Sequence, residues 1–121
     1  MGDIADVTMR GVEYAMQGLQ VRGDVRANNI ANAETPGYQA QRVSFADQLA
    51  GALAETDQRD AIGELQGPIT NLGTNAPDAH GNTVDLVQEM TEMTKDNLLT
   101  EAMVSAYNYK VTALRTAIRG Q

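Results

Sequence analysis

The chain has no cysteine and no tryptophan, and only one phenylalanine among its 121 residues. Without thiols it can form neither a disulfide framework nor a cysteine-based metal site. Large aromatic anchors are scarce, because only Phe45 and four tyrosines are present. Small and aliphatic residues and six methionines carry the apolar content instead. This composition favours slim helix-on-helix packing over a β-sandwich.

Positive charge is also in short supply, since nine Lys and Arg residues stand against 16 Asp and Glu residues, a formal net charge of -7. Phosphate binding requires clustered Lys and Arg, so the sequence argues against nucleic acid as a partner and against electrostatic docking on an anionic membrane. No run of 18 apolar residues predicts a membrane span. The acidic N-terminus lacks the apolar run of a cleavable signal peptide, so we expect any export to use another route.

Residues 3–33 contain no proline and are predicted to form one long helix. Two apolar stripes on nearly opposite faces follow steps of three and four residues: Ile4, Val7, Gly11, Tyr14, Gly18, Val21 and Val25, then Met9, Val12, Met16, Leu19 and Ile30. A helix with two stripes expects neighbours on two sides, which is a first indication of assembly. Gly11 and Gly18 either weaken the helix or let another backbone approach closely, and the sequence favours neither reading.

The first helix is predicted to stop at Thr35-Pro36-Gly37-Tyr38, where Pro-Gly fits the central positions of a type II turn and Gly37 supplies the positive φ. Ser44 is predicted to cap a short helix that runs to about Leu53. Residues 55–81 are rich in Gly, Pro and Asn with few apolar residues between them. We expect that stretch to be irregular and mobile in the isolated chain.

The segment from about Thr83 to Arg119 carries the clearest periodicity, because its apolar residues alternate in steps of four and three. This pattern is typical of a coiled-coil seam. Asn97 and Thr100 interrupt it midway; they are either tolerated there or set the register, and we favour register. The predicted seam consists of Leu86, Met90, Met93, Val104, Tyr107, Val111, Leu114 and Ile118.

Residues for catalysis or metal binding are hard to assemble from this sequence. His80 is the only histidine, and a metal site or a catalytic triad would need partners for it that the chain does not offer. Asp85, Glu89, Glu92 and Asp96 share one helical face, but a helix surface offers no cage for a cation. We expect a solvated acidic face, or one that meets a basic patch on a partner. The sequence therefore predicts no catalytic, cofactor or metal site.

Three asparagines lie within five residues near the end of the first predicted helix, namely Asn28, Asn29 and Asn32. Asparagine is unusual inside a helix, because its amide competes for local backbone groups. One interpretation is a helix C-terminus that gives way to a turn. The other is an amide ladder that bonds neighbouring helices or loops and fixes their register.

The stretch Ala27–Tyr38 closely resembles the N-terminal signature of the bacterial flagellar rod, hook and hook-associated proteins, in which an ANNIANA-like run leads into TPGY. The likeness extends to the C-terminal segment, from Gly81–Asp85 through Leu114–Arg119, while residues 39–80 match only loosely. Departures occur at Asp78-Ala79-His80 and at Met90–Met93. By position, the assembly motif of the family falls on Asn28, Asn29, Ile30, Asn32, Thr35, Pro36, Gly37 and Tyr38.

This resemblance implies an all-α fold in which the N- and C-terminal helices form an antiparallel coiled-coil pair around a partly irregular middle. The expected parts of the single domain are residues 1–38, 39–81 and 82–121. The implied function is that of a structural subunit of the proximal rod in the flagellar basal body, exported by the flagellar type III system, with neither enzymatic activity nor cofactor.

The partners implied are copies of the same chain, the rod proteins FlgC, FlgF and FlgG, and the MS ring and export gate at the base of the rod, with no nucleic acid and no small-molecule substrate. One alternative is that the chain is itself the sister proximal rod protein FlgC. The other, from a different class, is an acidic helical export chaperone or adaptor that binds a helix in a groove.

Overall fold

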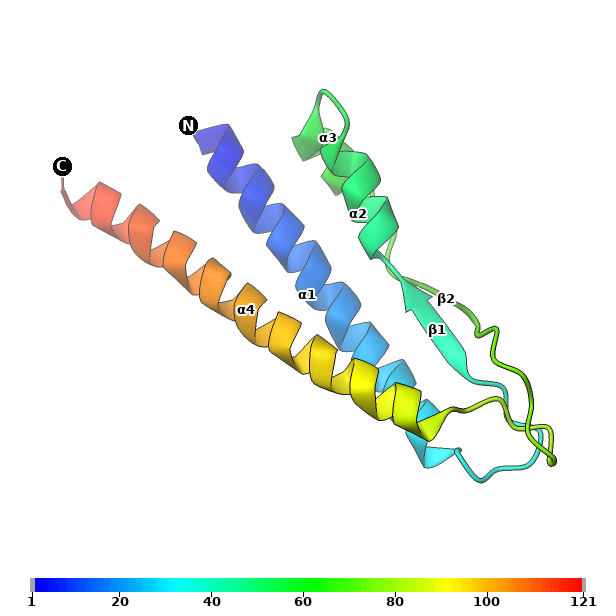
Figure 1. The fold of residues 1–121 in the computed structure, drawn as a ribbon. Helices are drawn as coiled ribbons and strands as arrows, with labels where there is room; N and C mark the ends of the chain where they lie inside the picture. The colour runs from blue at the N-terminus through cyan, green and yellow to red at the C-terminus, as the bar shows by residue number, and fades with distance from the viewer. Residues whose placement is uncertain (1, 121) are drawn as a thin grey trace.

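The computed structural model describes residues 2–120, with side-chain exposure given from Asp6 onward, and two long helices dominate it. Helix α1 spans Gly2–Ala31 and helix α4 spans Leu86–Arg119. They run side by side in opposite directions and diverge toward the two chain ends (Figure 1). The prediction of two long terminal helices that contact each other is confirmed.

The middle of the chain packs along the other side of α1 (Figure 1). It contains strand β1 (Gln41–Ser44), helices α2 (Ala46–Leu53) and α3 (Gln58–Gly63), and strand β2 (Ile69–Leu72). The two strands pair antiparallel, with Gln41 opposite Leu72 and Ser44 opposite Ile69. The fold is mostly helical, as predicted, but this small sheet means that it is not strictly all-α. The stretch over residues 55–81, which was predicted to be irregular, contains α3 and β2 and is without helix or strand only outside them. Four-residue strands paired across a long loop leave too short a pattern to be recognised in the sequence.

Helix α2 lies where a short helix was predicted, but its cap differs. Ser44 is the last residue of β1, and Phe45 occupies the N-cap position without a capping side-chain hydrogen bond. Ser44 cannot serve as the cap because its backbone is taken up in the ladder opposite Ile69. This arrangement turns the Phe45 side chain toward α1, where it enters the core.

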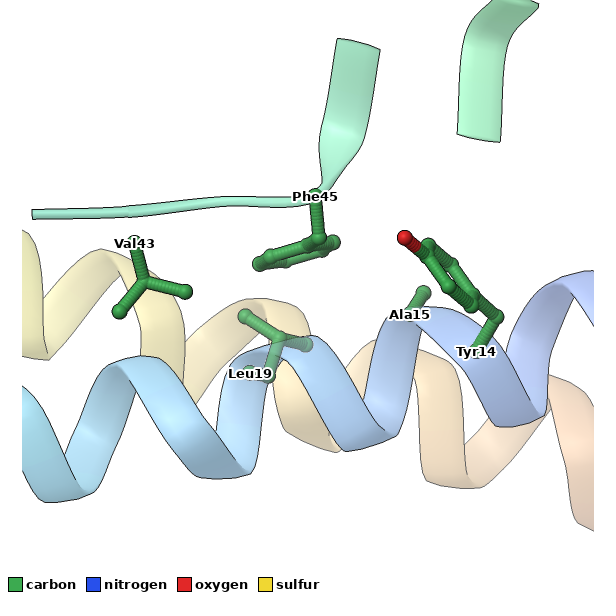
Figure 2. Packing of buried hydrophobic residues seen from close by; sticks show 5 residues of the cluster. All are labelled: Tyr14, Ala15, Leu19, Val43 and Phe45. Atoms are coloured by element: carbon green, nitrogen blue, oxygen red, sulfur yellow. The ribbon is translucent and has the colours of Figure 1, made fainter. Parts of the chain in front are cut away.

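The core is small and lies between α1 and the middle segment. Figure 2 shows its buried members converging, with Tyr14, Ala15 and Leu19 from α1 facing Val43 and Phe45. The Tyr14 hydroxyl donates to the Gln48 side chain at 2.7 Å, and burial raises the pKa of Tyr14.

Gly18 lies directly under the Phe45 ring, because a Cβ built at Gly18 would come within 2.3 Å of the ring. The close approach at this glycine is therefore made by an aromatic side chain and not by another backbone. From Gly11 onward the first predicted stripe of α1 packs on the middle segment, while the Ile4 side chain lies outside the described residues. In the second stripe, Leu19 joins the same core, and Met16 lines a groove toward α4. The first stripe therefore finds its neighbour within the chain, and a second molecule is not needed to cover it.

Candidate functional site

Charged side chains join α4 to the rest of the chain near the start of that helix. The ion-pair cluster consists of Arg22, Arg26, Arg42, Glu89 and Asp96. Arg22 binds both carboxylate oxygens of Asp96, at 2.8 and 2.6 Å. Arg26 lies between the two carboxylates and donates to Glu89 at 3.0 Å and to Asp96 at 3.2 Å.

Glu89 is the centre of this cluster. Its side chain is 0% exposed, and it accepts from Arg26, from Arg42 of β1, and from the Asn29 side chain at 3.3 Å. A buried carboxylate is tolerated only when it is paired and hydrogen-bonded, and this one has three donors. Glu89 therefore ties α4 to both α1 and β1.

The expectation of a solvated acidic face on the C-terminal helix is wrong for Glu89 and Asp96, because both are buried. They do meet a basic patch, but that patch belongs to the same chain. The signal was present in the sequence: Arg22, Arg26 and Asn29 are spaced by four and three residues, so they share one face of α1. Two antiparallel helices bring that face against Asp96 and Glu89 in reverse order.

Asn29 is 0% exposed and connects three elements through its amide. Its nitrogen donates to the Gln41 carbonyl at 2.9 Å as well as to Glu89. Its oxygen accepts from the Gln41 backbone N–H at 3.0 Å and from the Tyr38 hydroxyl at 3.3 Å. The amide thus stands in for a strand partner of β1, which explains an asparagine at this point of the helix.

The other motif residues close the end of α1. Tyr38 N–H donates to the Thr35 carbonyl at 3.2 Å, and Gly37 has a φ of 74°. The expected Pro-Gly turn is therefore present. Asn82, from the loop before α4, donates its side-chain nitrogen to the carbonyls of both Asn32 and Thr35 at 2.8 Å. The turn after α1 and the loop before α4 are consequently held together.

Two glycines allow this turn and this loop to touch. Gly81 has a φ of 79°, and a Cβ built there would lie 3.6 Å from the Cα of Gly37. Gly37 N–H donates to the His80 carbonyl at 2.9 Å. Asp78 shapes the loop by accepting backbone N–H groups of Asn82 and His80, and these bonds lower the pKa of its carboxyl. His80 is exposed and serves here through its backbone.

We predict that Asn29→Ala lowers the free energy of unfolding by about 2 kcal/mol, because the Gln41 backbone N–H and carbonyl lose their shared partner. Asn28→Ala is the matched control, since Asn28 is exposed and one residue away on the same helix. Its effect should stay within about 0.5 kcal/mol. Urea unfolding followed by circular dichroism measures both. Equal effects of the two substitutions would show that the Asn29 amide does not brace β1.

The predicted seam of α4 remains largely uncovered in the single chain. Six of its members are exposed, among them Met90 at 52%, and Tyr107 and Val111 are half-buried. Over the first half of α4, the side toward α1 is instead formed by the charged residues Glu89 and Asp96. The exposed members of the seam are Leu86, Met90, Met93, Val104, Leu114 and Ile118.

A groove of about 620 Å³ opens between α1 and α4 beyond the ion-pair cluster, with Met16 and Leu19 on one wall and Thr100 and Tyr107 on the other. Among the side chains of residues 6–120, no set of three histidine or acidic groups is placed to hold a metal ion. No helix in this described part combines the length and apolarity that crossing a bilayer requires. The features left for function are the exposed seam, the groove and the braced end of the helix pair.

Comparisons with known proteins all find flagellar basal body rod proteins. Residues 13–39 match the family model described as flagella basal body rod protein. The flagellar basal body rod protein FlgB of Bacillus subtilis (strain 168) is 32% identical, and the match covers 93% of this chain and 94% of that protein. FlgB of Aeromonas hydrophila is 31% identical over 90% of each chain. FlgB of Escherichia coli (strain K12) is 28% identical over 98% of each chain.

Proposed function

The chain belongs to the FlgB family of flagellar basal body rod proteins, and from this premise we propose that it polymerises through its terminal helices into the proximal rod. As a member of this family it is a structural component of the basal body and not an enzyme. The relatives named above carry the name FlgB and not that of the sister rod protein FlgC, which supports this assignment over the alternative. The partners we propose are copies of the chain and other rod proteins.

The observation that carries the proposal is the exposed seam of α4. Six large apolar side chains that recur along this helix are exposed in the single chain. A contiguous exposed apolar surface on a small protein marks an interaction site. The spacing of four and three residues fits another helix, because it presents knobs at the period of a coiled coil. In a rod subunit, the partner would be a helix of a neighbouring subunit.

The braced end of the helix pair supports the same proposal. A subunit that is repeated in a polymer needs its two long helices held at a defined angle, and Asn29, Asn82 and the ion-pair cluster provide that bracing. Asn29 and Tyr38 of the motif make contacts within the subunit, and in this proposal they fix the shape that is repeated in the assembly. We also propose export by the flagellar type III system and contacts with the MS ring and the export gate at the base of the rod.

We predict that Met90→Glu leaves the isolated subunit folded but strongly reduces its incorporation into rods. Met90 is exposed, so the change should alter the free energy of unfolding by no more than about 0.5 kcal/mol. At a helix interface the same carboxylate would be buried without a partner, and every 1.4 kcal/mol of cost is about a tenfold loss of affinity. Motility in a strain that lacks the native subunit and the yield of this chain in purified basal bodies measure the effect.

Ser105→Glu provides the matched control. It adds the same charge to an exposed position of α4 outside the seam. We expect motility and incorporation near the level of the unaltered chain. If Met90→Glu and Ser105→Glu support motility equally well, the seam is not an assembly contact and the proposal fails.

A further inference from the structure

We propose that the ion pairs of Glu89 and Asp96 decide which side of α4 faces α1, and thereby hold the apolar seam outward for assembly. This inference deepens the proposed function and rests on it for the role of the seam. The placement of α4 itself is a property of the single subunit. It can therefore be measured whether or not the seam is an assembly contact.

At three places in α4, a residue that faces α1 or the core precedes a seam position by one, whereas Thr100 and Tyr107, which also stand at seam positions, line the groove toward α1 themselves. Glu89 is followed by Met90, and Asp96 by Asn97, the polar residue within the seam. Met103, which packs against the core cluster, is followed by the exposed Val104. One residue corresponds to about 100° around a helix. Turning the first half of α4 by about a quarter of a revolution would therefore place Met90 against α1 and the carboxylates in solvent.

Apolar burial alone favours the other orientation. Near Glu89 and Asp96, the hydrophobic effect would turn Met90 inward and leave the carboxylates in water. The structure shows the opposite, with Glu89 fully buried and Met90 exposed. Charge pairing is the interaction that distinguishes the two orientations, because Arg22 and Arg26 lie on the face of α1 that α4 covers.

The geometry of the pairs makes them directional. Arg22 binds both oxygens of Asp96, and a two-pronged contact of this kind fixes the angle as well as the distance. The same guanidinium lies 4.8 Å from the centre of the Phe45 ring, so it is positioned by the core. Buried ion pairs add little net stability over apolar packing, and their best-attested role is to select one arrangement among several. Arg22, Arg26, Glu89 and Asp96 are accordingly positioning residues.

The chain has no cysteine, so single thiols can report which side of α4 is covered. We compare Met103→Cys with Val104→Cys in the isolated subunit by the rate of modification with a small thiol reagent. In the otherwise unaltered chain, the thiol at 104 should react faster by roughly tenfold, because the one at 103 is packed against the core. The ratio of the two rates then measures the orientation of α4.

The decisive variant moves the two carboxylates by one residue without changing composition, and combines Glu89→Met with Met90→Glu and Asp96→Asn with Asn97→Asp. If the ion pairs orient α4, the helix turns to restore them, and the rate ratio falls below one while the helical circular dichroism is kept. A ratio that stays near its original value overturns the proposal, because the loop before α4 would then fix the orientation alone. Loss of helicity in this variant also counts against it.

A second variant tests the same proposal with a smaller change to the helix. Glu89→Gln with Asp96→Asn keeps the shapes and removes the charges, and the ratio should approach one. The conservative Asp96→Glu should keep most of the original ratio, which a purely steric role of this side chain would not predict. Glu101→Gln, at an exposed position of α4, should leave the ratio of the two rates unchanged. An unchanged ratio in the folded Glu89→Gln, Asp96→Asn variant contradicts the proposal. Normal motility of Met90→Glu contradicts only the proposed function.

Discussion

Glu89→Ala should lower the free energy of unfolding by about 3–5 kcal/mol, the cost of breaking a buried ion pair by removing one partner. The loss would leave Arg26 with only Asp96 as an acceptor, in a position where its Nε already lacks one among the described residues. Asn29 would lose its contact to α4 at the same time. Since small domains are stable by about 5–15 kcal/mol, this one change would remove a large part of the total.

Urea unfolding of the isolated chain, followed by the helical signal, measures this effect. Glu101→Ala is the control, because Glu101 is an exposed carboxylate on the same helix and should contribute no more than about 0.5 kcal/mol. The loss in free energy of unfolding for Glu89→Gln should lie between those of Glu89→Ala and Glu101→Ala, because glutamine keeps the shape of the side chain. A free energy of unfolding that is the same for Glu89→Ala and Glu101→Ala would contradict the structure at its most buried charge.

Gly18→Ala should lower the free energy of unfolding by about 3 kcal/mol, at the upper end of the usual cost of overpacking. The added methyl group would overlap the Phe45 ring, which lies 2.3–2.6 Å from the Cβ position. The ring would have to leave the cluster it forms with Leu19 and Val43. The substitution of a helical glycine by alanine normally stabilises, so the expected sign is the reverse of the helix propensity.

Gly23→Ala is the matched control on the same helix. A Cβ at Gly23 meets nothing within 4 Å, so the variant should be more stable by about 0.5–1 kcal/mol. Thermal unfolding of the two variants should therefore shift in opposite directions. If both are stabilised, the Phe45 ring does not pack on Gly18, and the core of the subunit is not the one described.

The long terminal helices could be predicted because long periodic segments give a strong local signal. The turn at Thr35–Tyr38 could also be predicted, since Pro-Gly allows few backbone conformations. The pairing of β1 with β2 could not be predicted, because four-residue strands separated by a long loop depend on tertiary partners such as Asn29. The prediction of Ser44 as the cap of α2 was wrong for the same reason, since strand pairing at Ser44 overrode the preference of serine for a helix N-cap.

The faces of the helices were harder to predict than the helices themselves. A periodic apolar pattern says that a side is buried, but it does not say whether the partner lies in the same molecule. In α1 the first stripe, from Gly11 onward, is buried against the middle of the same chain. In α4 most of the apolar seam is left outside, while Glu89 and Asp96 are inside. Arg22 and Arg26 share one face of α1, so the sequence alone offers them as partners for the carboxylates of α4. Which carboxylates they reach depends on how the two helices align, and that alignment cannot be read from the sequence.

The most direct test of the seam as an assembly contact is the reactivity of the Met90→Cys thiol in two states of the same subunit. In the free subunit the thiol should react rapidly, because Met90 is exposed. In purified basal bodies that contain the subunit, we predict that the same thiol is protected by roughly a hundredfold or more, as expected for a side chain buried at a helix interface. Equal reactivity in the free and the assembled subunit would contradict the seam as the contact between rod subunits.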